Sequence, residues 1–113
     1  MNGPEVKSIT CRELFELIEA GPIKLIDVRT PEEFVQRRAA GAQNVPLDSE
    51  SLCDLLGEPT FGRAEPVYFI CEVGGRSGYA CAAFMAAGHP NVINVEGGTQ
   101  AWVEAGLPLV SGT

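Results

Sequence analysis

The chain has 113 residues, of which 45% are hydrophobic and 20% are charged, and its formal net charge is −7. We predict one domain over residues 1–113, because a chain of this length and apolar content can bury one ordinary core. The acidic composition disfavours nucleic acid and anionic membranes, since both need a basic protein face. We therefore expect no nucleic-acid partner and no membrane partner.

The cysteines indicate reduced thiols rather than a disulfide framework or a metal site. Cys11, Cys53, Cys71 and Cys81 include no C-x-x-C pair, and their spacing to the single histidine, His89, is not that of metal ligands. We predict no metal and no cofactor. No signal-peptide pattern opens the chain and no apolar run has membrane-spanning length. Together with reduced thiols, these features favour a cytoplasmic location.

Short apolar runs are predicted to be strands, and helix-like segments separate them. This alternation is typical of an α/β domain with a largely parallel sheet. The segment from Glu58 to Pro66 is expected to be a loop, because it contains two prolines and a glycine. In chain order, the expected strands are Val6 to Ile9, Lys24 to Val28, a short strand around Val45, Val67 to Ile70 and Val92 to Val95.

Residues typical of helix starts and stops mark the segments between these strands. Thr10 and Glu13 form a capping-box pattern, and Thr30-Pro31-Glu32-Glu33 repeats it with proline at the first helical position. Glycines follow the predicted helix ends. The expected helices are one from Thr10 to Gly21, one that begins at Pro31, Ser51 to Leu56, Ser77 to Ala87, and one that holds Trp102 and ends at Gly106.

The segment from Cys71 to Ser77 carries the strongest functional signal. It lies between a predicted strand and a predicted helix, where ligands of open α/β sheets bind. Backbone N–H groups of such a turn converge on one point, and the helix N-terminus adds about half a positive charge there. A thiol at that point ionises easily. We predict that Cys71 is a catalytic nucleophile and that Glu72 to Ser77 form its binding loop, provided that a substrate can reach the thiol.

The loop residues suggest separate roles. Gly74 and Gly75 permit positive φ and so let the amides face inward. Arg76 opposes the dipole of the helix that it begins, so we expect an anion or thiolate partner for it. Ser77 is either the N-cap of that helix or a donor to the sulfur, and the sequence leaves both open. Glu72 is expected to repel a dianionic substrate, unless its side chain points to solvent.

Other candidate residues have weaker signals. Asp27 and Arg29 flank the end of a predicted strand, and we expect them to tie this end of the sheet to neighbouring loops. Cys81 is expected in the core. Cys11 and Cys53 lie on predicted helices, and a redox role for either is left open.

These motifs resemble the rhodanese family of sulfurtransferases over nearly the whole chain. Four pieces in the right order and spacing make the resemblance specific. One departure is Arg38-Ala39-Ala40, which stands where the family often has glycine-histidine-isoleucine. The segments that match the family's first signature, its second segment, its active-site loop and its closing signature are Leu25 to Phe34, Gly41 to Pro46, Cys71 to Ser77, and Asn94 to Gly98 with Ala101-Trp102 and Gly106-Leu107-Pro108.

The resemblance implies a rhodanese-like three-layer α/β domain, with a five-stranded, mainly parallel sheet and helices on both faces. It implies a sulfurtransferase in which Cys71 takes a sulfane sulfur from thiosulfate or a thiol persulfide and hands it to cyanide or a thiol. The loop from Glu72 to Ser77 would cradle the persulfide with its amides, and Arg76 would help to bind an anionic donor. The expected partners are a small-molecule sulfur donor and acceptor, or a thiol-bearing protein.

Two alternatives stay open. A sulfur-relay or interaction module would pass the sulfur only to a dedicated protein partner. A cysteine phosphatase or arsenate reductase uses a thiolate with an arginine, but it places a longer segment between them than the one from Glu72 to Gly75. The shorter ring favours a sulfur atom over a tetrahedral oxyanion. Glu72 and the acidic composition weigh against thiosulfate and favour a thiol-based or protein persulfide as donor.

Overall fold

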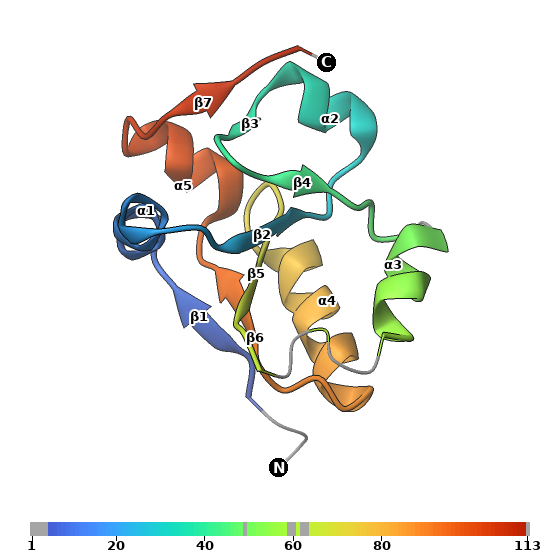
Figure 1. The fold of residues 1–113 in the computed structure, drawn as a ribbon. Coiled ribbons are helices and arrows are strands. Elements are labelled where there is room, and N and C mark those ends of the chain that lie inside the picture. The colour runs from blue at the N-terminus through green and yellow to red at the C-terminus, as the bar shows by residue number, and fades with distance from the viewer. Residues whose placement is uncertain (1–4, 49, 59–60, 62–63, 113) are drawn as a thin grey trace.

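The computed structural model describes residues 5–48, 50–58, 61 and 64–112 and has a central parallel sheet (Figure 1). The strand order is β1-β6-β5-β2-β4, and all neighbouring strands in it run parallel. These strands are β1 (Lys7–Ile9), β2 (Lys24–Asp27), β4 (Gln43–Asn44), β5 (Val67–Ile70) and β6 (Val92–Val95). A separate antiparallel pair joins β3 (Arg38–Ala39) to β7 (Leu109–Val110).

Helices cover both faces of the sheet, which confirms the predicted fold class (Figure 1). α1 and α5 pack on one face, and α3 and α4 pack on the other. No helix in the described ranges is both long and apolar enough to cross a bilayer. The helices are α1 (Cys11–Ala20), α2 (Pro31–Gln36), α3 (Glu50–Leu56), α4 (Gly75–Ala86) and α5 (Gly98–Glu104).

Capping boxes set where α1 and α2 begin, as the sequence predicts. The Thr10 hydroxyl accepts a hydrogen bond from the Glu13 amide, and the Glu13 carboxylate accepts one from the Thr10 amide, both at 3.1 Å. Thr30 and Glu33 repeat this exchange at the start of α2, at 3.1 and 3.2 Å. A cap of this kind satisfies amides that have no partner within the helix and contributes about 1 kcal/mol.

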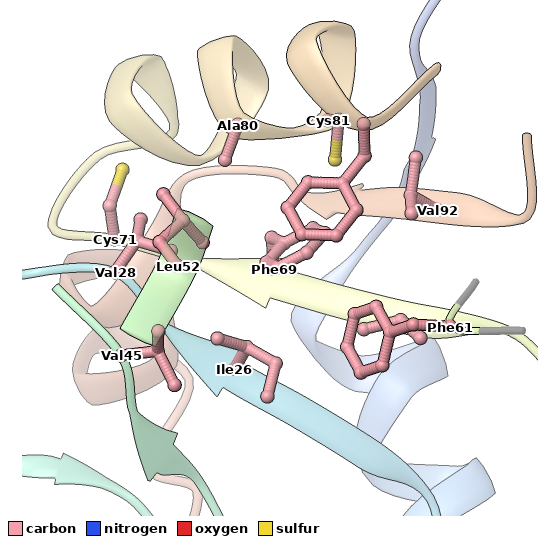
Figure 2. Packing of buried hydrophobic residues seen from close by; sticks show 12 residues of the cluster. Ile26, Val28, Val45, Leu52, Phe61, Phe69, Cys71, Ala80, Cys81 and Val92 are labelled. Carbon is pink, nitrogen blue, oxygen red and sulfur yellow. The ribbon is translucent and has the colours of Figure 1, made fainter. Parts of the chain in front are cut away.

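The central strand β5 divides the core between the two faces of the sheet, because successive side chains of a strand point to opposite sides. Val67 and Phe69 pack with α3 and α4, whereas Tyr68 and Ile70 pack with α1 and α5. Figure 2 shows the first of these clusters. There the Phe84 ring lies 5.0 Å from the Phe69 ring, and burial of a Phe side chain stabilises the fold by about 1.5–3 kcal/mol.

Several element boundaries differ from the prediction. Val28 lies outside β2, and the short strand predicted around Val45 comprises Gln43–Asn44. The Val45 amide still donates to the Asp27 carbonyl at 2.9 Å, but Pro46 has no N–H with which to continue the ladder. Val6 lies outside β1.

The N-terminus of α4 also differs from the prediction. The helix begins at Gly75 rather than Ser77, and its N-cap is Gly74, whose φ is 111°. The N-cap interpretation of Ser77 is therefore wrong. The β3 and β7 strands, two residues each, were not predicted. In the predicted loop over 58–66, positions 59, 60, 62 and 63 lie outside the described residues, and the remaining positions contain no helix or strand.

The start of α5 holds the end of β5 in place. The Thr99 amide donates to the Cys71 carbonyl at 2.8 Å, and the Gln100 amide donates to the Glu72 carbonyl at 3.0 Å. Gly98 allows this approach, because its φ is 59° and a Cβ atom there would lie 2.5 Å from the Cys71 carbonyl oxygen. A side chain at this position would push α5 away from the loop.

We predict that Gly98→Ala lowers the free energy of unfolding by about 2 kcal/mol or more, because it combines positive φ with a backbone clash. Urea denaturation measures the loss. Gly21→Ala is the matched control, since a Cβ there meets nothing within 4 Å and its φ of 164° is ordinary extended backbone. Equal stability of the two variants would contradict the predicted close packing of α5 on the loop.

Candidate active site

The Cys71 thiol lies beside the first turn of α4, at the carboxyl end of β5 (Figure 2). The Gly74 amide donates to Sγ at 3.1 Å, and the Ser77 hydroxyl lies 3.3 Å from it. The amides of Val73 and Ser77 belong to the same turn and also help to lower the pKa of the thiol. Positive φ at Gly74 turns the chain so that these donors face one point. The result is a ring of hydrogen-bond donors around one sulfur atom.

This ring distinguishes Cys71 from the other buried thiols. Burial alone raises the pKa of Cys11, and it raises the pKa of Cys81 to about 12. Burial also raises the pKa of Cys71, but hydrogen bonds from Ser77, Gly74 and Val73 outweigh it, so that the pKa is lowered overall. Hydrogen bonds that favour the charged form have this effect. Among these three thiols, Cys71 is therefore the one suited to act as a thiolate nucleophile.

Cys71 is more buried than a thiol in an open turn. The residue exposes 1% of its surface, whereas Val73, two positions further along the loop, exposes 60%. The thiol thus lies just beneath an exposed loop. The accessible thiol that the sequence analysis required is therefore not what this structure shows.

Asn94 connects the loop to β6. Its side-chain oxygen accepts a hydrogen bond from the Ser77 hydroxyl at 2.5 Å, and its side-chain nitrogen donates to the Gly74 carbonyl at 3.3 Å. The Ser77 hydroxyl has one proton for three acceptors within 3.3 Å, which are the Asn94 side chain, the sulfur and the Gly74 carbonyl. Asn94 therefore fixes the orientation of two loop residues that contact Cys71.

Glu72 does not point freely into solvent, which the sequence left open. Its carboxylate accepts from Arg37 at 2.7 Å and from Arg29 at 3.3 Å. The side chain is 29% exposed. The repulsion of a dianion that we expected from Glu72 is therefore reduced by two cations within 3.3 Å.

Asp27 and Arg29 form a buried ion pair under the loop. The Arg29 guanidinium donates to the Asp27 carboxylate at 2.9 Å, and Nη2 also donates to the Arg37 carbonyl at 2.6 Å. Asp27 and Arg29 are at most 1% exposed. Because Arg29 also reaches Glu72, this pair links the end of β2 to the first loop residue. A supporting role for Asp27 and Arg29 stays a prediction.

Arg76 has an anion partner, but the partner is within the chain. Its Nη1 and Nη2 atoms donate to the two carboxylate oxygens of Glu33 at 2.8 and 3.0 Å. The hydrogen bond from Arg76 lowers the pKa of Glu33 to about 2, and the same bond raises the pKa of Arg76. Both side chains stay partly exposed, at 40% and 32%.

The sequence analysis missed Glu33, Arg37 and Asn94 as site residues. Asn94 had a usable signal, because it is polar within an otherwise apolar strand and pairs in register with Phe69, two residues before Cys71. Glu33 was recognised only as a capping residue. For Arg37 the sequence offers no local signal, since its partner lies 35 positions away.

Among the described residues, no three His, Cys, Asp or Glu side chains gather in a way that could hold a metal ion. All four cysteines are free thiols, and Cys53 is the exposed one.

Comparison with known proteins identifies the family. Residues 10–105 match the family model described as Rhodanese-like domain. The chain is 35% identical over 109 residues to Thiosulfate sulfurtransferase 16, chloroplastic, of Arabidopsis thaliana, which covers 89% of this chain and 90% of that protein. A protein named Sulfurtransferase, from Allochromatium vinosum, is 34% identical over 84% of this chain and 85% of its own length.

Solved structures agree with this result. The crystal structure of a rhodanese-like domain protein from Staphylococcus aureus superposes with a TM-score of 0.73 at 36% identity, covering 86% of this chain and 91% of that one. The chain therefore belongs to the rhodanese-like family, and the two relatives named above are sulfurtransferases.

Proposed function

We propose that this protein is a sulfurtransferase that carries a sulfane sulfur as a persulfide on Cys71. The observation that carries the proposal is a buried thiol at the carboxyl end of β5 that faces two hydrogen-bond donors, the Gly74 amide at 3.1 Å and the Ser77 hydroxyl at 3.3 Å. These bonds help to lower the pKa of Cys71. Thiolate, not thiol, is the reactive form. The names of the two sulfurtransferase relatives support the same reaction class.

The reaction has two displacement steps. In the first, the Cys71 thiolate attacks the outer sulfur of the donor, an S–S bond forms, and the donor's own bond to that sulfur breaks. The leaving group, sulfite or a thiolate, takes the electron pair. In the second step cyanide or a thiolate attacks the terminal sulfur, and the Cys71 thiolate leaves. The loop amides stabilise the negative sulfur at both stages.

The phosphatase and arsenate reductase alternative has less support. That chemistry needs an arginine free to bind a tetrahedral oxyanion over the thiolate, whereas Arg76 holds the Glu33 carboxylate through both of its Nη atoms. The sulfur-relay alternative uses the same persulfide and differs only in the acceptor. Rapid turnover with small molecules alone would exclude a relay that depends on a dedicated protein partner.

We further propose that the protein works in a reducing compartment such as the cytoplasm. Four free cysteines support this, because thiols persist where glutathione and thioredoxin keep them reduced. The proposed partners are a small-molecule sulfur donor and acceptor, with a thiol-bearing protein as the alternative acceptor.

We predict that incubation with a sulfane donor adds the mass of one sulfur atom to the protein and that Cys71→Ser abolishes the gain. Only a thiolate at this position can hold the transferred sulfur. Intact mass spectrometry measures the gain, and Cys53→Ser is the matched control because it removes the exposed thiol. Sulfur loading that survives Cys71→Ser, or that disappears with Cys53→Ser, would contradict the assignment.

We predict that the Cys71 thiolate forms at a lower pH than an ordinary thiol and that Ser77→Ala moves its titration to higher pH. Since a hydrogen bond to a charged group contributes about 1.5–3 kcal/mol, the thiolate fraction near neutral pH should fall about tenfold. Iodoacetamide alkylation against pH, in a Cys53→Ser background, measures the change.

Ser111→Ala controls for the loss of a hydroxyl, because Ser111 is exposed and lies far from the site in the chain. Its alkylation profile should match that of the parent. An unchanged profile in Ser77→Ala would show that the amides alone set the pKa of Cys71.

A further inference from the structure

Both charged residues of the catalytic loop are paired with residues in or next to α2. Glu72, at the start of the loop, binds Arg37, the residue that follows α2. Arg76, at the other end of the loop, binds Glu33 within α2. The two pairs have opposite polarity, so each neutralises one loop charge. A donor that approaches Cys71 therefore meets no unpaired charge on either of these loop residues.

The Glu33 carboxylate is held firmly in place. Its Oε1 atom accepts from the Thr30 amide at 3.1 Å and from the Thr30 hydroxyl at 3.2 Å, while Arg76 donates to both oxygens. A bidentate pair of this kind is strong and directional. The lowered pKa of Glu33, about 2, keeps the carboxylate charged throughout the physiological range. Glu33 therefore competes with any anionic donor for the Arg76 guanidinium.

We propose that Glu33 sets the donor selectivity of the enzyme by occupying Arg76, so that a dianionic donor such as thiosulfate binds weakly and a persulfide of a small thiol is favoured. The inference rests on the proposed sulfur transfer. Thiosulfate needs a cation to offset its two charges near a thiolate. To bind the Arg76 N–H groups that hold Glu33 it must displace that carboxylate, whereas the reacting end of a persulfide carries a single charge at most and has less need of the cation.

The two donors react through the same bond changes. With thiosulfate, Cys71 bonds to the sulfane sulfur and sulfite leaves with the electron pair. With a persulfide R–S–SH, Cys71 bonds to the outer sulfur and R–S⁻ leaves with the electron pair. Both reactions give the same Cys71 persulfide and neither needs an oxidant. Because the bond changes are alike, a difference in how Arg76 helps to bind the donor can select between them.

Glu33→Gln tests this proposal with little change in structure. Glutamine at the third helical position can still accept from Thr30 and keep the capping box, but it no longer carries the charge that holds Arg76. Glu13→Gln is the matched control. Glu13 occupies the same position in the capping box of α1 with Thr10, and no ion pair of Glu13 occurs among the described residues.

We expect Glu33→Gln to raise kcat/KM for thiosulfate about threefold to tenfold, mainly through a lower KM, because exposed charge pairs contribute about a decade or less. Glutathione persulfide should gain less, so that the ratio of kcat/KM for the two donors changes threefold or more. Thiocyanate formation from cyanide measures both activities. Glu13→Gln should leave the ratio as in the parent protein.

A double variant tests whether Glu33 acts through Arg76. Glu33→Gln in an Arg76→Ala background should no longer improve thiosulfate use. An unchanged or lower thiosulfate kcat/KM in Glu33→Gln, or an equal gain in the Arg76→Ala background, would overturn the proposal. Thermal unfolding of the variants shows whether a smaller folded fraction accounts for any loss of kcat/KM.

Failure of the selectivity proposal differs visibly from failure of the proposed function. If Cys71 gains no sulfur mass from either donor in the parent protein, sulfur transfer itself is wrong. If Cys71 gains sulfur but Glu33→Gln leaves the ratio of kcat/KM for the two donors unchanged, only the selectivity proposal is wrong.

Discussion

The site depends on hydrogen bonds that favour the charged form of a buried sulfur. Desolvation raises the pKa of Cys71, and hydrogen bonds from Ser77, Gly74 and Val73 lower it overall. Those donors converge because β5 ends where α4 begins. The carbonyls of Cys71 and Glu72 accept hydrogen bonds from the start of α5. Two helix N-termini therefore meet at one strand end, and each satisfies a different set of backbone groups.

Local signals in the sequence predicted much of this arrangement, but they did not predict its tertiary contacts. The capping boxes at Thr10 and Thr30, the five strands and the position of Cys71 follow from residue type and spacing alone. The predicted start of α4 was wrong. Gly74, in the left-handed conformation, caps the helix, so that it begins before Ser77, which is the more usual type of capping residue. Arg37 could not be found, because its ion pair exists only when α2 packs beside the loop.

The helix α2 has a larger role than its six residues suggest. It starts directly beyond the end of β2, where the buried Asp27–Arg29 pair reaches the Arg37 carbonyl and the Glu72 carboxylate. Removal of one partner from such a buried pair costs about 3–5 kcal/mol. The Arg37–Glu72 and Arg76–Glu33 pairs are both partly exposed. The loop is thus paired with residues in or next to α2 at both of its charged positions.

Donor selectivity and thiol ionisation can be separate properties of one loop, because different groups act on them. The charged form of Cys71 is favoured by hydrogen bonds at 3.1 and 3.3 Å, which salt screens little because the sulfur is buried. Attraction of a donor acts over a longer range, and there the chain's formal net charge of −7 opposes any anion. With Glu72 and Arg76 both paired, the field from the loop does little to offset that repulsion. Charge at Glu33 can therefore change which donor binds, while the ring of donors that ionises Cys71 stays the same.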